Sequence, residues 1–151
     1  MGVNGLRTNV QNKQVMISHF KIKRDVYEDM IVYCQKVLPN EACGLLSGIT
    51  DTGDTLWKLK NESLNPNRFY MSMEAIKLAV QNMEHKGEKL SGIFHSHPST
   101  PAFPSSHDIE NNPYTDLAYL IVSFYKGKVD VACFKMHGNT VMPIKLIVVD
   151  E

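Results

Sequence analysis

The chain has 151 residues, enough for one domain that buries roughly 70% of the surface exposed by its unfolded form. Its 16 Lys and Arg residues balance its 16 Asp and Glu residues, so no net charge favours nucleic acid or an anionic membrane as a partner. Three cysteines, none in a Cys-x-x-Cys pair, are an odd number for a disulfide framework, which is therefore not expected.

The amino-terminal end differs in composition from the rest of the chain. Residues 1–14 are polar and rich in Asn, so we expect a flexible segment there and a single domain over residues 15–151. The first residues lack the apolar core of a signal peptide, and nowhere is there a run of about 18 apolar residues that could span a membrane. These absences favour a cytoplasmic protein.

The first half of the predicted domain alternates strands with helices. Residues 16–22 alternate apolar and polar side chains, which predicts a strand with one buried face. Apolar residues then recur at helical spacing over 24–38, and Pro39 ends that helix, which places Glu41 at a helix-to-strand junction. The elements predicted next are a strand at 45–49, a turn at 51–54, a strand at 55–60 that completes a hairpin, a loop at 61–70, and a helix at 73–86 capped by Ser72.

The second half of the chain is richer in strands. A short buried strand at 90–94 leads into residues 96–106, a stiff loop with three prolines and five Ser or Thr residues. The elements predicted after it are a helical turn at 108–111, strands at 118–125 and 129–136 that form a hairpin, and a final strand at 144–149. The pattern as a whole predicts an α/β fold of mixed, α+β character, with helices packed against one mixed sheet.

Two histidines, His95 and His97, follow the predicted strand at 90–94. Residues two apart in a strand point to the same face, so both imidazoles could bind one ion. Neutral imidazole is a good zinc ligand, and a catalytic zinc site uses three protein ligands and keeps a fourth position open. Chance alone gives about 0.24 such pairs in a chain with six histidines, so two ordinary surface histidines are the alternative.

Asp108 is the candidate for the third ligand. It begins the helical turn that follows the Pro-rich loop, and from there its carboxylate can return to the two imidazoles. Two histidines and one carboxylate would complete a zinc site of the catalytic type.

A family resemblance rests on these residues. His95-Ser-His-Pro, six further residues and Ser105-x-x-Asp108, with Glu41 far upstream in Asn-Glu-Ala-Cys-Gly-Leu-Leu, resemble the JAMM motif of the MPN-domain metalloproteases. The similarity covers nearly the whole chain, from about Val15 to Val149, and the compact length resembles prokaryotic members. It implies a JAMM/MPN domain over residues 15–151, with a curved mixed β-sheet flanked by helices, similar to the cytidine deaminases.

The resemblance also implies a role for each residue of the motif. His95, His97 and Asp108 would hold Zn²⁺, Glu41 would act as general acid and base, and Ser105 would donate to the oxyanion of the tetrahedral intermediate. Two alternatives stay open from the residues themselves. Glu41 could be a solvated carboxylate at a helix end, and Ser105 could be the N-cap of the turn at Asp108.

The function that this implies is hydrolysis of the peptide or isopeptide bond at the Gly-Gly tail of a ubiquitin-like or sulfur-carrier protein, without nucleic-acid or membrane partners. The loop at 61–70 and the strand at 56–60 could form the channel for that tail. One alternative is an MPN-type binding or scaffold module. Another is a zinc hydrolase of a non-protein amide, such as a deaminase, although the H-x-E and P-C-x-x-C elements of deaminases are missing.

Overall fold

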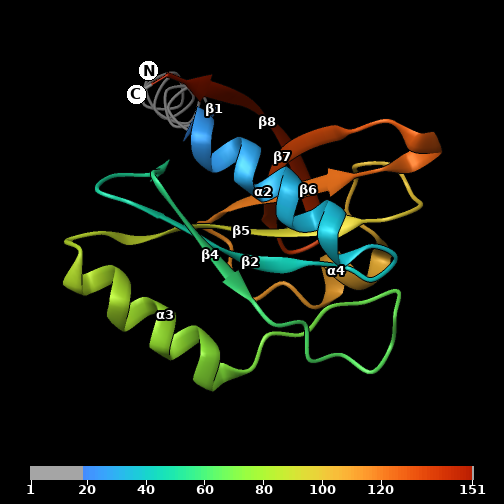
Figure 1. The fold of residues 1–151 in the computed structure, drawn as a ribbon, viewed down its shortest axis with the longest axis horizontal. Coiled ribbons are helices and arrows are strands. Elements are labelled where there is room, and N and C mark those ends of the chain that lie inside the picture. Colours follow the sequence, from blue (N-terminus) through green and yellow to red (C-terminus); the bar gives the residue numbers. More distant parts are fainter. Residues whose placement is uncertain (1–18, 151) are drawn as a thin grey trace, which may run out of the picture.

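A computed structural model describes residues 19–150, which form one eight-stranded mixed sheet in the order β3-β1-β8-β7-β6-β5-β2-β4 (Figure 1). The segment expected to be flexible, 1–14, and the first residues of the predicted strand at 16–22 lie outside the described residues. The elements are β1 (His19–Lys23), α2 (Arg24–Val37), β2 (Cys43–Gly48), β3 (Thr52–Gly53), β4 (Thr55–Leu59), α3 (Met73–His85), β5 (Lys89–His97), α4 (Ser106–Glu110), β6 (Ala118–Ser123), the 3-10 turn η1 (Tyr125–Gly127), β7 (Asp130–His137) and β8 (Thr140–Val149).

The sheet contains both antiparallel and parallel strand pairs. β2 pairs antiparallel with β4, and β6, β7 and β8 follow one another as an antiparallel meander. β5 is parallel to β6, and β1 is parallel to β8, which brings the first described strand beside the last (Figure 1). The strand that carries the two histidines, β5, therefore lies inside the sheet between β2 and β6.

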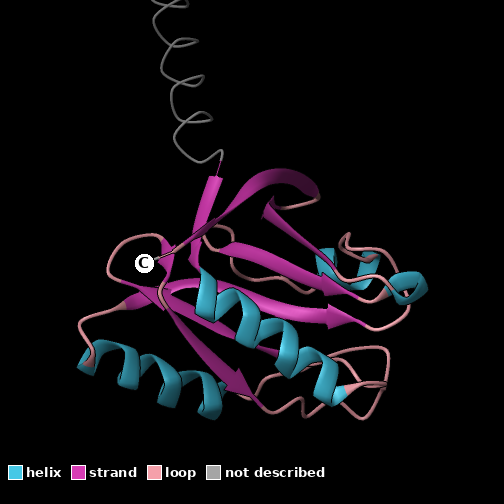
Figure 2. Cartoon of the chain, turned by 45° about the horizontal axis from the view of Figure 1, so that its top comes forward, coloured by secondary structure: helices cyan, strands magenta, loops and turns pink. Residues whose placement is uncertain are grey.

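Two hydrophobic clusters cover the two faces of this sheet, and the two long helices flank it (Figure 2). Met30 of α2 packs in one cluster together with Phe94, and Met83 of α3 packs in the other together with Ile93. Because side chains alternate along a strand, His95 follows Ile93 onto the α3 face. The fold thus places the histidine pair on the side of the sheet that α3 and the loop before it cover.

Most of the predicted elements are confirmed, and the differences concern strand bounds, one additional short strand and the start of a helix. The helical turn predicted at 108–111 begins at Ser106 as α4, so Asp108 is its third residue, because Ser105 is the N-cap. The strand predicted at 90–94 runs from Lys89 to His97, because the ladder to β6 continues as far as the pair His97 and Ser123. The strand predicted at 144–149 already begins at Thr140. Thr52–Gly53, predicted as part of a turn, pairs with β1 as a short parallel strand. Among the described residues, no helix is both long enough and apolar enough to cross a membrane.

Candidate metal centre

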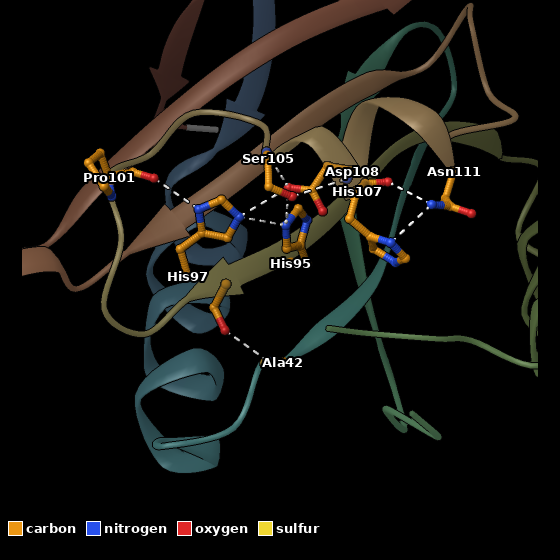
Figure 3. Close-up of polar contacts among 9 residues, drawn as sticks. Ala42, His95, His97, Pro101, Ser105, His107, Asp108 and Asn111 are labelled. Atoms are coloured by element: carbon orange, nitrogen blue, oxygen red, sulfur yellow. Dashed lines mark hydrogen bonds and ion pairs between the residues drawn. The ribbon is translucent and has the colours of Figure 1, made fainter. Parts of the chain in front are cut away.

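Three side chains converge at the end of β5 and the start of α4 (Figure 3). The Nε2 atoms of His95 and His97 are 3.0 Å apart. The Oδ2 atom of Asp108 lies 3.3 Å from the first of these nitrogens and 3.2 Å from the second. All three residues are buried, so the structure brings together the three ligands that the sequence proposes.

The loop between β5 and α4 orients His97. The Nδ1 atom of His97 lies 2.9 Å from the carbonyl oxygen of Pro101, which can only accept, so Nδ1 carries the proton. In the neutral imidazole Nε2 is then the unprotonated nitrogen, and in the protonated ring Nε2 donates to Asp108, which it faces at 3.2 Å. The contact of Nδ1 with Pro101 is the second contact that metal-binding histidines usually make, and it fixes the tautomer before any ion arrives.

The first turn of α4 orients Asp108. Its Oδ2 accepts from the backbone N–H of Ser105 at 2.9 Å, and the hydroxyl oxygen of Ser105 accepts from the N–H of Asp108 at 3.1 Å. This reciprocal capping box makes Ser105 the N-cap of α4, one of the two roles open from the sequence. The hydroxyl proton of Ser105 is not used in this pair of bonds.

The charges of the three side chains depend on one another. Burial alone would raise the pKa of Asp108, but hydrogen bonds from His95, His97 and Ser105 hold it well below its usual value. Burial lowers the pKa of His95. Burial also acts to lower the pKa of His97, but the contacts of His97 with Asp108 and Pro101 outweigh burial and raise it. The cluster therefore offers a carboxylate and two imidazoles, the donor set that zinc prefers.

The geometry fits a small divalent cation. Tetrahedral ligands at zinc distances are about 3.3–3.6 Å apart. The three donor atoms here are slightly closer, at 3.0–3.3 Å, so a shift of a few tenths of an ångström brings them to that spacing. Two aromatic rings enclose His95: Phe69 stacks on it at 4.5 Å between ring centroids, and Tyr119 meets it edge-on at 5.4 Å. The Nδ1 atom of His95 has no partner among residues 19–150, so aromatic packing supplements the contacts that its Nε2 makes with His97 and Asp108.

Glu41 lies beside this cluster, at the junction of α2 and β2. The segment is tied to β5 because the N–H of Ala42 donates to the Ser96 hydroxyl at 2.8 Å, and the N–H of Ser96 donates to the Ala42 carbonyl at 3.0 Å. Glu41 is only 7% exposed, and its Oε1 has no partner within the described part of the chain. Burial raises the pKa of Glu41 to about 8, against the opposing charge of His97. A solvated helix-end carboxylate, the alternative reading of this residue, is thereby excluded.

Asn61, which sequence reasoning did not single out, organises the loop next to Glu41. Its amide nitrogen donates to the carbonyls of Glu41 and Arg68, both at 3.0 Å. Its amide oxygen accepts from the N–H groups of Ser63 at 2.9 Å and Tyr70 at 3.0 Å. One side chain thus closes the base of the loop that carries Phe69. An Asn directly after a strand is the only local signal for this, because its partners are distant in sequence.

We expect Asn61→Ala to destabilise this loop by about 1–3 kcal/mol, since the groups that the amide satisfies lose their partners. Amide hydrogen exchange would then speed up at Ser63 and Tyr70 while the amides of β5 and β6 keep their protection. Asn67→Ala is the matched control, because Asn67 is an exposed Asn in the same loop. Equal exchange at these two amides in Asn61→Ala and wild type would contradict this role.

A cavity of about 680 Å³ opens beside Asp108. Its walls are mostly apolar and come from the loop at 63–71, the start of α3, β5, β6 and the segment after α4; they include Phe69, Met71, Ile76, Ile93, Tyr114 and Tyr119. The loop half of the predicted channel is therefore part of this wall, but the strand at 56–60 is not. Lys60, at the end of that strand, lines a second cavity of about 370 Å³ together with Glu41 and the start of the same loop, so the predicted combination of loop and strand is found there.

Other reactive side chains in the region have structural settings. Cys43 is fully buried, and burial raises its thiol pKa to about 12, so it is a poor nucleophile at neutral pH. His107 lies within the motif but contacts Asn111 through its Nδ1, at 3.1 Å, and is not part of the cluster. Burial, and then the charges of Asp108 and Glu41, raise the pKa of Tyr119, which keeps its hydroxyl protonated.

A buried centre of two imidazoles and one carboxylate, with the further buried carboxyl group of Glu41 beside it, has the donor set and general base of a metal-dependent hydrolase. The family described as prokaryotic homologs of the JAB domain matches residues 23–135 of the chain. The chain therefore belongs to this family, and with it to the JAMM-type metallopeptidases. The fold and the family expected from the sequence are confirmed.

Individual relatives agree with this assignment. A desampylase from Pyrococcus furiosus is 30% identical over 108 residues, which are 72% of this chain and 76% of that protein. A CysO-cysteine peptidase from Mycobacterium tuberculosis is 31% identical over 105 residues, which are 68% of this chain and 71% of that protein. The solution structure of a protein from Desulfitobacterium hafniense matches with a TM-score of 0.80 at 32% identity, covering 87% of this chain and 94% of that one.

Proposed function

We propose that this chain is a zinc-dependent peptidase that hydrolyses the peptide or isopeptide bond after the Gly-Gly tail of a ubiquitin-like or sulfur-carrier protein. The observation that carries the proposal is the convergence of three buried donor atoms, 3.0–3.3 Å apart, one of which belongs to Asp108 in the wall of a 680 Å³ cavity. The desampylase and the CysO-cysteine peptidase among the relatives support the substrate class.

His95, His97 and Asp108 would hold the zinc ion, which supplies Lewis acidity and lowers the pKa of a bound water toward neutrality. Glu41 takes the proton of the attacking water and passes it to the departing amine. Its burial suits this task, because it brings the carboxyl pKa close to neutral pH. The Oε1 atom of Glu41 has no hydrogen-bond partner among the described residues, so it is available to accept a proton from water and to donate it to the amine.

Ser105 is our candidate for stabilising the oxyanion of the tetrahedral intermediate. The backbone N–H of Asp108 donates to its hydroxyl oxygen, so the O–H group is left to donate to another acceptor. The capping box holds the residue next to the third metal ligand. A donor held in place in this way stabilises the developing charge without reorganising during the reaction.

The cavity beside Asp108 suits an extended, narrow peptide segment. Its apolar walls would bury the tail, and glycines without side chains would allow the backbone to come close to the metal ligands. Exposed apolar side chains lie around the same loop and helix start, namely Leu64, Tyr70 and Met73, and would contact the folded body of the carrier. A cytoplasmic location stays a prediction from the sequence.

The test uses mass spectrometry of ubiquitin-like and sulfur-carrier proteins that carry extra residues after Gly-Gly. The zinc-loaded enzyme is expected to cut after the second glycine, and a chelator is expected to abolish the cut until zinc is restored. A cut that persists in the metal-free enzyme would refute the proposal, as would an uncut Gly-Gly bond across all carriers tested. A scaffold module, the alternative function, would bind carriers without cutting them.

A further inference from the structure

Tyr119 lies near the start of β6 and lines the same cavity as Asp108. It is in register with Ile93 of the neighbouring strand β5, and its ring meets the imidazole of His95 edge-on at 5.4 Å between centroids. Only 2% of the residue is exposed. The side chain therefore forms part of the wall next to a metal ligand.

The hydroxyl of Tyr119 is a buried polar group beside the metal cluster. Within residues 19–150 no hydrogen bond joins it to another group, although buried phenols usually have a partner. Tyr119 lines the 680 Å³ cavity, so a group that enters the cavity meets this side chain.

The hydroxyl of Tyr119 and the cavity wall around it determine which kind of ligand group could bind there. A phenol at neutral pH carries a proton and can donate it to an acceptor. The cavity wall combines apolar residues such as Phe69 and Ile93 with other side-chain donors, among them Arg68, Asn111 and Tyr114. Tyr119 is a donor that lies against the metal ligand His95. A glycine tail has polar groups only in its backbone, and its carbonyl oxygens are the acceptors.

We propose that the Tyr119 hydroxyl donates a hydrogen bond to a backbone carbonyl of the Gly-Gly tail and is a binding determinant for the substrate. This inference rests on the proposed function. It assigns Tyr119 to substrate binding and not to the chemical step, because a bond of this kind is present both before and during the reaction.

Tyr119→Phe tests the proposal, because it removes the hydroxyl and keeps the ring against His95. We expect kcat/KM to fall about tenfold, mainly through a higher KM, while zinc content and the unfolding temperature do not fall. The metal-free variant is expected to bind a peptide ending in Gly-Gly about tenfold more weakly than metal-free wild type, measured by NMR titration. Tyr125→Phe, in the exposed turn η1, is the matched control and should change neither value.

Equal peptide affinity for Tyr119→Phe and wild type would overturn the inference, as would a wild type that does not bind the peptide. A large fall in unfolding temperature would assign the hydroxyl to the stability of the fold instead. These outcomes can be distinguished from a failure of the proposed function, because the titration needs neither zinc nor turnover. If the enzyme binds the peptide through Tyr119 but cuts no carrier, the binding role of Tyr119 stands and only the proposed reaction is refuted.

Discussion

Replacing Glu41 by Gln is expected to lower kcat by about 10²–10⁴-fold and to leave one zinc ion bound. The amide has the size of the carboxyl group but cannot accept a proton from water or return one to an amine. The buried side chain contributes none of the three converging donor atoms, so metal affinity should be nearly unchanged. Single-turnover kinetics and metal analysis of the purified variant measure the two effects.

Glu62→Gln provides the control for Glu41→Gln. Glu62 is an exposed carboxylate next to Asn61, whose amide donates to the Glu41 carbonyl, and Glu62→Gln makes the same change from carboxyl to amide at the protein surface. It should keep wild-type kcat and zinc content. If Glu41→Gln loses zinc as completely as a ligand variant does, the role assigned to Glu41 is wrong.

Replacing His97 by Ala is expected to abolish stable zinc binding and, with it, detectable cleavage. Two ligands remain, and the Oδ2 atom of Asp108 loses the imidazole that lies 3.2 Å away. Because zinc that binds only the folded protein stabilises it, wild type should show a rise in unfolding temperature on adding zinc, and His97→Ala should show none. Calorimetric titration of zinc into the metal-free proteins measures the affinity directly.

His107→Ala is the matched control for zinc binding. His107 lies in the same motif, but its ring contacts Asn111 and stays outside the cluster. This variant should bind one zinc ion as wild type does. Zinc loss in His107→Ala together with zinc retention in His97→Ala would reverse the assignment of ligands.

The sequence alone determined the parts of this protein that depend on neighbouring residues. Helical periodicity and Pro39 predicted α2 to within one residue of its end, and Ser72 caps α3 as expected, accepting from the N–H of Ala75. The ligand candidates followed from the chemistry of imidazole and carboxylate and from the spacing of His95, His97 and Asp108. These features are local, because a turn, a cap or an i, i+2 pair is defined by a few successive residues.

Only the tertiary structure decided features that depend on distant pairing. β5 extends through both histidines because β2 and β6 supply hydrogen-bond partners on its two sides, which no local propensity records. The burial of Glu41 also needs the fold, since the segment is held against β5 through Ser96. The same holds for Asn61, whose amide reaches the carbonyl of Glu41, and for Tyr119, whose position beside His95 follows from the parallel pairing of β5 and β6. In each case the position of the side chain depends on residues that are far apart along the chain and come together only when the sheet forms.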